Sequence, residues 1–287
     1  MILGGTSISR RLPFEKMQGV GNDFVVLAER DVDALDLPKL ARVMCDRHFG
    51  VGADGLLILC ASHRAGYRMR MFNPDGSEDD CGNGLRCIVR YIRLHHSTDS
   101  RFVVETKCGV HEAEILEHEP ERSIIRVMMG EPRFSPAEIP VCIDAPEVVS
   151  YLLPIGERER RFTCVNTGSA HAVTFVDALP EDESFLAESR RVETHPIFPE
   201  RTSVIWAKAQ DLHRLKIRIW ERGAGETLGC GTGACAAAVA AILEGYGEGP
   251  ITVESPGGAL DIDWRRGEPI RMSGPAATVF SGEWPLP

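Results

Sequence analysis

The 287-residue chain lacks features that would place it in several broad classes of protein. It has no excess of positive charge: its formal net charge is −10, so the basic footprint of a nucleic-acid-binding protein is missing. Its longest apolar run, Ala234 to Leu243, is too short to span a bilayer, and Met1 to Arg11 has no apolar stretch like that of a signal peptide. We therefore expect a cytoplasmic protein with neither a nucleic-acid nor a membrane partner.

The chain also lacks paired cysteine motifs, although it contains nine cysteines. The number is odd and the cysteines are scattered, which argues against a secreted disulfide framework. None shows C-x-x-C spacing, so a structural zinc site is not expected. Taken singly, each cysteine reads as a small buried hydrophobic residue. The question is which of the nine have another role.

Two cysteines stand out because the sequence repeats around them. Gly76-Ser-Glu-Asp-Asp-Cys81-Gly-Asn-Gly resembles Gly225-Glu-Thr-Leu-Gly-Cys230-Gly-Thr-Gly. Each motif runs directly into a helical pattern, over residues 85–94 and 234–243. Glu105 follows Cys81 by 24 residues, and Glu254 follows Cys230 by the same number. The period is about half the chain, which indicates a duplicated domain and not a solenoid.

Each half reads as short strands around one prominent helix. The strand candidates are 24–27, 56–59, 67–72, 102–105 and 124–128 in the first half, and 173–176, 203–207, 215–220, 251–254 and 260–264 in the second. Pro132 to Pro146 is rich in proline and reads as a linker. This pattern predicts an α+β fold with two similar domains.

The position of Cys81 and Cys230 at helix starts suggests chemistry. A helix N-terminus carries unpaired N–H groups and partial positive charge, so it favours thiolates and binds carboxylates. Two such halves facing each other would place a thiol on either side of a small carboxylate. Racemisation needs one base to remove an α-proton and one acid to return a proton from the opposite face. Such chemistry needs no metal and no cofactor. The alternatives are a turn that merely caps a helix, or a redox pair.

The motifs resemble diaminopimelate epimerase over nearly the whole chain. The resemblance is carried by Met17-Gln-Gly-Val-Gly-Asn22-Asp-Phe24, Asp46-Arg-His-Phe-Gly-Val-Gly-Ala-Asp54, Phe72-Asn73-Pro-Asp-Gly-Ser77-Glu78 and Glu221-Arg222-Gly-Ala-Gly-Glu226-Thr, together with both cysteine motifs. It implies two pseudo-symmetric domains, each a strand-rich barrel around a central helix. The first would span 1–130, with 275–287 returning to it, and the second 131–274.

The resemblance also implies roles for individual residues. Cys81 and Cys230 would be the acid/base pair. The backbone at Gly82-Asn83 and Gly231-Thr232 would hold the reacting carboxylate. Glu221 would pair with an ammonium group and Arg222 with a distal carboxylate, through its planar fork. The remaining predicted substrate-binding residues are Asn22, Asn73 and Ser203, with His171, Ser169 and Gly55 in supporting positions. Family members are often homodimers.

Three positions depart from the common family pattern. The chain has Ser169-Ala170-His171 where Asn-Pro-His is common, Ser203 where Asn is common, and Gly55 where some members have Gln. Serine offers one hydroxyl where asparagine offers both a donor and an acceptor. The leading hypothesis is the interconversion of LL- and meso-diaminopimelate for lysine and peptidoglycan synthesis. The alternatives are a two-cysteine racemase of another amino acid such as histidine, and a non-catalytic thiol-redox protein.

Overall fold

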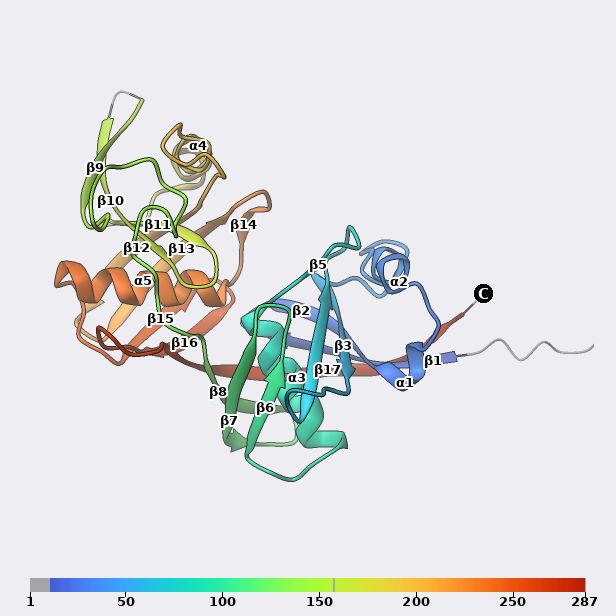
Figure 1. Ribbon diagram of the computed structural model, residues 1–287. Coiled ribbons are helices and arrows are strands. Elements are labelled where there is room, and N and C mark those ends of the chain that lie inside the picture. The colour runs from blue at the N-terminus through green and yellow to red at the C-terminus, as the bar shows by residue number, and fades with distance from the viewer. Residues whose placement is uncertain (1–10, 157, 287) are drawn as a thin grey trace, which may run out of the picture.

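The computed structural model describes residues 11–156 and 158–286 as two strand-rich halves, each wrapped around one long helix (Figure 1). The predicted helices are confirmed and begin three residues earlier than the apolar patterns: α3 is Gly82–His95 and α5 is Gly231–Glu244. Their first turns are built from the glycines of the two motifs, which carry no apolar signal. Of the described helices, none combines the length and apolar character needed to cross a membrane.

The strands of the first half close into a barrel around α3. Its strands are β1 (Arg11–Gly19), β2 (Asn22–Ala28), β3 (Gly55–Cys60), β4 (Tyr67–Phe72), β6 (Arg101–Glu105), β7 (Val110–His118) and β8 (Arg122–Met128). They pair in this order, and β17 (Arg271–Pro285) joins β8 to β1. The interior face of the ring and the helix share one apolar core.

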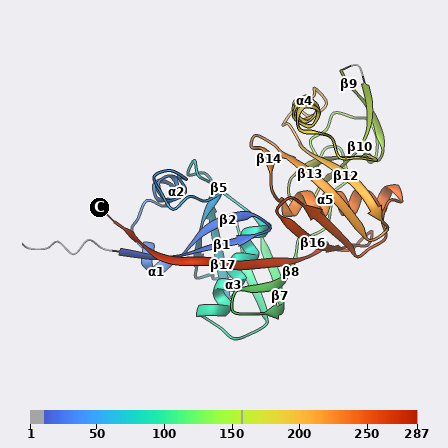
Figure 2. The ribbon, with the colours of Figure 1, turned by 180° about the vertical axis from the view of Figure 1, so that it is seen from behind.

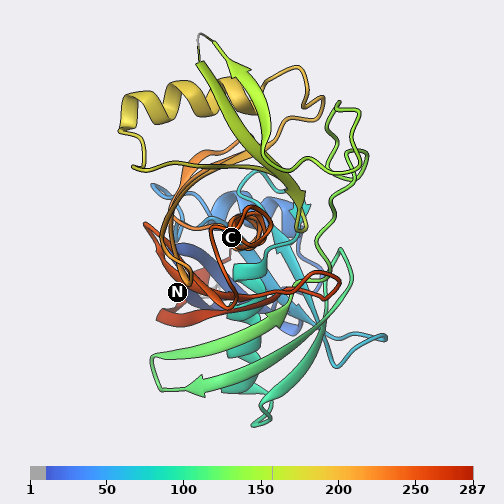
Figure 3. The same cartoon turned by 90° about the vertical axis from the view of Figure 1, so that its left-hand side faces the viewer.

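The second half repeats this arrangement around α5, which Figure 3 views along its axis. Its strands are β10 (Arg158–Asn166), β11 (Ala170–Phe175), β12 (Ser203–Asp211), β13 (Arg214–Glu221), β15 (Ile251–Ser255) and β16 (Gly258–Asp263), followed by the beginning of β17. A single bridge between Arg133 and Asn166 completes the ring. The parallel pairs β2–β3 and β4–β6 correspond to β11–β12 and β13–β15.

Helix α5 can lie inside a ring of strands because it is apolar on all sides. Ala234, Ala236, Ala237, Ala238, Ala240 and Ala241 are all buried. Small side chains around the whole circumference let strands approach from every direction, whereas a surface helix would need a polar face. Gly245 ends the helix in the left-handed conformation, with φ of 76°, where glycine has no Cβ penalty.

Strand β17 connects the two halves (Figure 2). Residues 271–273 pair with β16 of the second half, and residues 277–285 pair with β1 of the first. The predicted domain limits of 1–130, 131–274 and 275–287 therefore divide a continuous strand, and residues 1–10 and 287 lie outside the described part. These limits stay a prediction.

All ten predicted strands coincide with observed strands, apart from one residue at the end of 173–176 and one at the end of 260–264. The prediction omitted several elements: β1, β7, β10, β17, α1 (Glu29–Val32), α2 (Leu37–Met44), β5 (Glu78–Asp79), β9 (Tyr151–Ile155), α4 (Asp182–Glu193) and β14 (Gly225–Thr227). Strands β7 and β10 are rich in charged residues on their outer faces, which weakens their apolar alternation.

Candidate functional site

Cys81 and Cys230 occupy equivalent positions, each as the N-cap residue of its helix. Both have extended backbones, with φ and ψ of −151° and 120° at Cys81 and −130° and 118° at Cys230. The Cys81 carbonyl accepts the first helical hydrogen bond from Leu85, and the Cys230 carbonyl accepts the equivalent bond from Ala234, both at 2.9 Å. The Sγ of Cys230 also accepts a hydrogen bond from the Gly233 N–H at 3.4 Å. Both cysteines therefore stand at a helix N-terminus, and the Cys230 thiol is held against it.

The two helix starts meet between the halves. The side-chain amide of Asn83, two residues after Cys81, donates to the carbonyl of Gly229, directly before Cys230, at 3.5 Å. The side chain of Met272 lies between the helices. Its Cε would be 3.2 Å from a Cβ added at Gly82, and 3.3 Å from one added at Gly231. Residues 146 positions apart in sequence thus form one site at the junction.

Backbone atoms of the two halves are also in close contact at this junction. The β1–β2 turn contains Val20, which has a positive φ of 49°. A Cβ at Gly257, in the turn between β15 and β16, would overlap the carbonyl oxygen of Val20, and a Cβ at Gly229 would do the same. Glycine is therefore required at both positions for the halves to approach this closely.

We expect Gly257→Ala to destabilise the protein. The added methyl has no free direction, because it also lies 2.9 Å from the Leu228 carbonyl oxygen, so the halves must shift apart. Overpacking of this kind costs about 1–3 kcal/mol, which urea denaturation measures as a lower midpoint. Gly66→Ala is the matched control, since its methyl would meet nothing closer than 3.7 Å. Equal midpoints for the two variants would contradict a tight junction.

In the first half, Asn22 links Cys81 to the side chains of Asn83 and Asp54 by hydrogen bonds. The Cys81 thiol donates to the Asn22 Oδ1 at 3.3 Å, and the Asn83 amide donates to the same oxygen at 3.3 Å. The Asn22 amide in turn donates to Asp54 at 2.8 Å. Gly55 follows Asp54 directly and begins β3. Asn22, Gly55 and Asn83 thus lie on one connected path around Cys81.

Asn73 was also predicted to bind substrate, but in the structure its hydrogen bonds are to Ser77, within its own turn. It begins the turn after β4, where its side-chain amide donates to the Ser77 hydroxyl at 3.1 Å. Its backbone N–H also donates to the Ser77 carbonyl at 2.8 Å. Both bonds shape the turn that leads to Cys81.

In the second half, the predicted residues form a chain of contacts that ends at Cys230. The Ser169 hydroxyl lies 3.0 Å from the His171 Nε2 and 3.3 Å from the Thr232 Oγ1. The Thr232 Oγ1 lies 3.3 Å from the Cys230 Sγ. His171 pairs in register with Ser203 across β11 and β12. The structure therefore brings together residues that are separated in sequence by up to 63 positions.

Arg222 lies at the open end of this group. Its backbone N–H donates to the Ser203 hydroxyl at 3.1 Å, and its guanidinium donates to the Glu200 carbonyl at 3.1 Å. Burial, and secondly the positive charge of Arg222, lower the pKa of His171 to about 3. His171 is therefore neutral at physiological pH, and its buried Nδ1 has no hydrogen-bond partner among the described residues. Its contacts suit a supporting position better than a proton-transfer role.

The helix starts act on both thiols in the predicted direction, but the expected net fall in their pKa values is not found. Backbone N–H groups do lower the pKa values of Cys81 and Cys230, but burial outweighs them. Burial raises the pKa of Cys81 to about 11 and the pKa of Cys230 well above its usual 9. The carboxylate of Glu221 raises both values further. Both thiols are therefore protonated in this state.

Glu221 is the charged group shared by the two cysteines. It accepts a hydrogen bond from the Thr227 hydroxyl at 2.5 Å and lies at the end of β13. Burial, and to a smaller degree the negative charge of Asp54, raise the pKa of Glu221. Asp54 and Cys81 belong to the first half and Glu221 and Cys230 to the second, so charges of the two halves act on each other across the junction.

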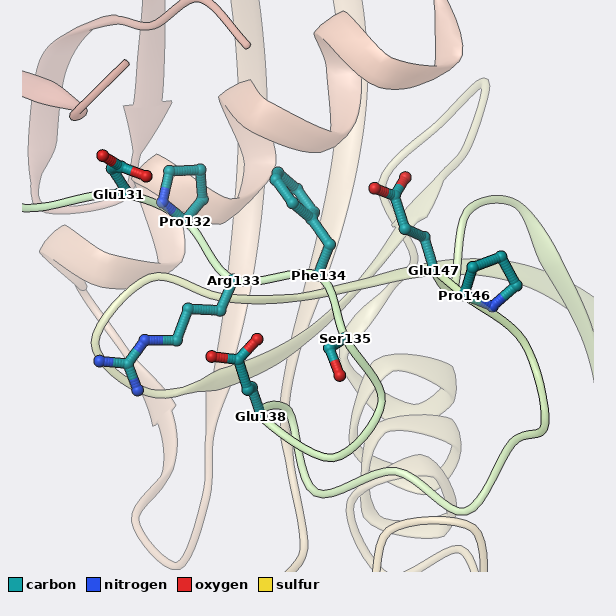
Figure 4. Close-up of a pocket in the computed structure, with 8 residues that line it drawn as sticks. All are labelled: Glu131, Pro132, Arg133, Phe134, Ser135, Glu138, Pro146 and Glu147. Carbon is teal, nitrogen blue, oxygen red and sulfur yellow. The ribbon is translucent and has the colours of Figure 1, made fainter. Parts of the chain in front are cut away.

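A separate hollow, of about 560 Å³, lies in the segment between the halves (Figure 4). It is lined by Glu131, Pro132, Arg133, Phe134, Ser135, Glu138, Pro146 and Glu147, none of which belongs to the cysteine motifs. Within residues 11–156 and 158–286, no group of three or more His, Cys, Asp or Glu side chains is arranged to hold a metal ion.

Sequence reasoning missed three residues of this site. Asp54 lies in a quoted motif, but only the structure shows that it holds Asn22. Thr227 belongs to the second cysteine motif and binds Glu221. Arg86 lies one turn inside α3, where a charged side chain normally signals the exposed face of a helix, yet it is fully buried. No feature of the sequence marks Arg86 as buried.

Comparisons with known proteins agree with this geometry. The profile of the diaminopimelate epimerase family matches residues 14–135 and 163–279, one segment in each half. The diaminopimelate epimerase of Pelotomaculum thermopropionicum is 46% identical, over 95% of this chain and 98% of its own. That of Desulforudis audaxviator is 44% identical, over 95% and 99%.

Among solved structures, a hydroxyproline epimerase from Agrobacterium vitis, crystallised with trans-4-hydroxy-L-proline, has a TM-score of 0.66 at 13% identity. The similarity covers 96% of this chain and 93% of that one. At this level of identity the likeness concerns the fold, and it confirms the predicted barrel-and-helix architecture.

Proposed function

The chain belongs to the diaminopimelate epimerase family, and on that premise we propose that Cys81 and Cys230 are the acid and base of its reaction. It is an isomerase that interconverts LL- and meso-diaminopimelate, a reaction of lysine biosynthesis. The observation that carries the assignment of the two cysteines is the contact between Asn83 and Gly229, which joins the two helix starts. A carbon held between those starts would have one thiol on each face.

The proposed reaction transfers one proton at each face of the α-carbon. One cysteine, as thiolate, removes the α-proton, and the thiol of the other donates a proton to the opposite face. Negative charge develops on the substrate carboxylate during the transfer. The N–H groups at Gly82-Asn83 and Gly231-Thr232 would stabilise it, because they lie at the starts of two helices that meet at one junction. The reverse reaction uses the same groups with their roles exchanged.

The remaining residues would bind the substrate. Glu221 is a partly buried carboxylate whose charge acts on both thiols, and it would pair with the α-ammonium group. Arg222 would hold the distal carboxylate, since it makes a single side-chain hydrogen bond within the described residues and has donors to spare. Asn22, Ser169 and Ser203 would complete the polar lining, with His171 and Gly55 behind them and Asn73 in the adjoining turn.

Deuterium exchange tests both the chemistry and the substrate. In heavy water with reductant, we expect deuterium to enter the α-position of LL-diaminopimelate as the meso form accumulates, which mass spectrometry and chiral chromatography follow together. Histidine and other monocarboxylic amino acids should exchange far more slowly, because they leave Arg222 unpaired. Exchange of no amino acid would contradict the two-base mechanism. Exchange of histidine alone would contradict the diaminopimelate assignment.

We infer further that the enzyme works in the cytoplasm. The nine cysteines are all unpaired in the structure, which suits a reducing compartment. The proposed reaction itself needs both thiols reduced. Of the partners, the amino-acid substrate follows from the family, whereas the homodimer stays a prediction.

A further inference from the structure

Arg86 is a fully buried cation without a carboxylate partner. Its side chain is 0% exposed, and within the described residues no Asp or Glu oxygen lies within salt-bridge distance of its guanidinium. An uncompensated buried charge is costly, so a protein that keeps one gains something from it. Arg86 lies on α3, one turn after the motif that begins at Cys81.

The contacts of Arg86 aim its guanidinium at the junction of the halves. One Nη donates to the Asn83 Oδ1 at 2.8 Å, the Nε donates to the Pro275 carbonyl at 3.3 Å, and the other Nη lies 3.7 Å from the Met272 sulfur. The backbone approaches closely on one side: a Cβ at Gly19 would lie only 3.1 Å from the Nη2. The guanidinium is therefore fixed from α3, β1 and β17 together.

The residue that Arg86 holds is the one that links the two cysteine motifs. With its Oδ1 bound by Arg86, the Asn83 amide is turned so that its Nδ2 faces Asn22 and Gly229. Asn22 receives the Cys81 thiol, and Gly229 precedes Cys230. An asparagine side chain could otherwise rotate by half a turn and present its oxygen to the Gly229 carbonyl, which would be repulsive.

The positive charge of Arg86 also acts on Cys81. Its positive charge lowers the pKa of Cys81, in opposition to burial and to Glu221, which raise it. No other cation is among the principal influences on that thiol. Because the guanidinium lies behind the α3 start and inside the protein, water screens it little.

We propose that Arg86 is a positioning residue of the epimerase, which fixes the Asn83 amide and supplies a positive charge behind the carboxylate-binding helix starts. This inference rests on the proposed function of the two cysteines. The charge would favour both the Cys81 thiolate and the negative charge that develops on the substrate carboxylate. The Asn83 bond would keep the two helix starts in register with each other.

Arg86→Met tests the charge, with Arg90→Met as the matched control. Arg90 is also fully buried on α3 and free of carboxylate partners among the described residues, but it bonds Ser123 and the carbonyls of Glu119 and Pro120. We expect Arg86→Met to slow alkylation of Cys81 by iodoacetamide about tenfold at a pH below the thiol pKa, because the pKa rises by roughly one unit. Peptide mass spectrometry assigns the modified cysteine. Arg90→Met should leave this rate unchanged.

The effect on catalysis should likewise differ between Arg86→Met and Arg90→Met. We expect Arg86→Met to lower kcat by about 10²-fold, as for loss of one group that stabilises developing negative charge, and to move the acid limb of the kcat/KM profile to higher pH. Equal alkylation rates and pH profiles in Arg86→Met and wild type would overturn the proposal. The alkylation measurement needs no substrate, so it remains decisive even if the wild-type protein epimerises nothing and the proposed function fails.

Arg86→Lys tests the positioning and decides the matter if Arg86→Met does not fold. Lysine keeps the charge, so the alkylation rate of Cys81 should stay within a few-fold of wild type. A single ammonium group cannot hold Asn83 and Pro275 in the fixed geometry of the guanidinium fork, so kcat should fall about tenfold. Wild-type kcat and KM in a folded Arg86→Lys variant would overturn the positioning role.

Discussion

Cys81→Ala and Cys230→Ala should each lose epimerisation by about 10²–10⁴-fold, and each should retain α-proton exchange of one stereoisomer only. A protein with one remaining thiol can remove the proton on its own face and return a deuteron to the same face. Inversion needs an acid on the opposite face, which each variant lacks. The two variants should therefore exchange opposite stereoisomers of the α-centre. Chiral chromatography combined with mass spectrometry distinguishes exchange with retention from exchange with inversion.

The controls for this experiment lie on the same two helices. Cys87→Ala and Cys235→Ala remove buried thiols further along α3 and α5, where neither lies at a helix start. Both variants should epimerise with kcat close to that of wild type. If Cys81→Ala and Cys230→Ala exchanged the same stereoisomer, the thiols would lie on one face of the substrate and the two-face mechanism would be wrong. A small loss in either variant would indicate that water replaces the missing acid.

The duplicated fold could be predicted because two separate parts of the sequence carry the same motif. One Cys-Gly-x-Gly motif before a helix could be an ordinary cap, but two copies with equal spacing to Glu105 and Glu254 constrain each other. The structure reproduces that spacing as equivalent strand pairings, β4–β6 and β13–β15. Strand β17 escaped prediction because its 15 residues pair with different strands along their length, and their burial pattern changes from one part to the next.

The electrostatics of the site could not be read from the sequence. The effect of a helix start on a thiol can be inferred from position alone, whereas the effect of burial depends on what packs around Cys81 and Cys230. Glu221 is 140 residues from Cys81, yet its negative charge acts on that thiol. Arg86 was missed for the same reason, since a charged residue on a helix is buried only if another part of the chain covers it. Long-range packing thus decides the protonation state that local sequence leaves open.

Glu221→Gln should make both thiols more reactive and the enzyme less active. The Glu221 carboxylate raises the pKa values of Cys81 and Cys230, so its removal should lower both, and iodoacetamide should alkylate both cysteines faster at neutral pH. Epimerisation should nevertheless fall, with kcat/KM reduced about 30- to 5,000-fold, because truncating one partner of a buried ion pair costs about 2–5 kcal/mol. The substrate α-ammonium group would lose its counter-charge.

The opposite signs of these two effects separate Glu221 from a residue that is merely structural, since partial unfolding would raise alkylation of the buried cysteines as well, such as Cys87 and Cys235. Glu226→Gln is the matched control. Glu226 lies five residues after Glu221, and its carboxylate accepts a hydrogen bond from Arg218 at 2.7 Å, away from both thiols. It should leave alkylation and kcat/KM unchanged. With the ammonium group bound, Glu221 would no longer oppose thiolate formation, so substrate binding itself should activate the base. Slower alkylation of Cys81 and Cys230 in Glu221→Gln would reject this coupling.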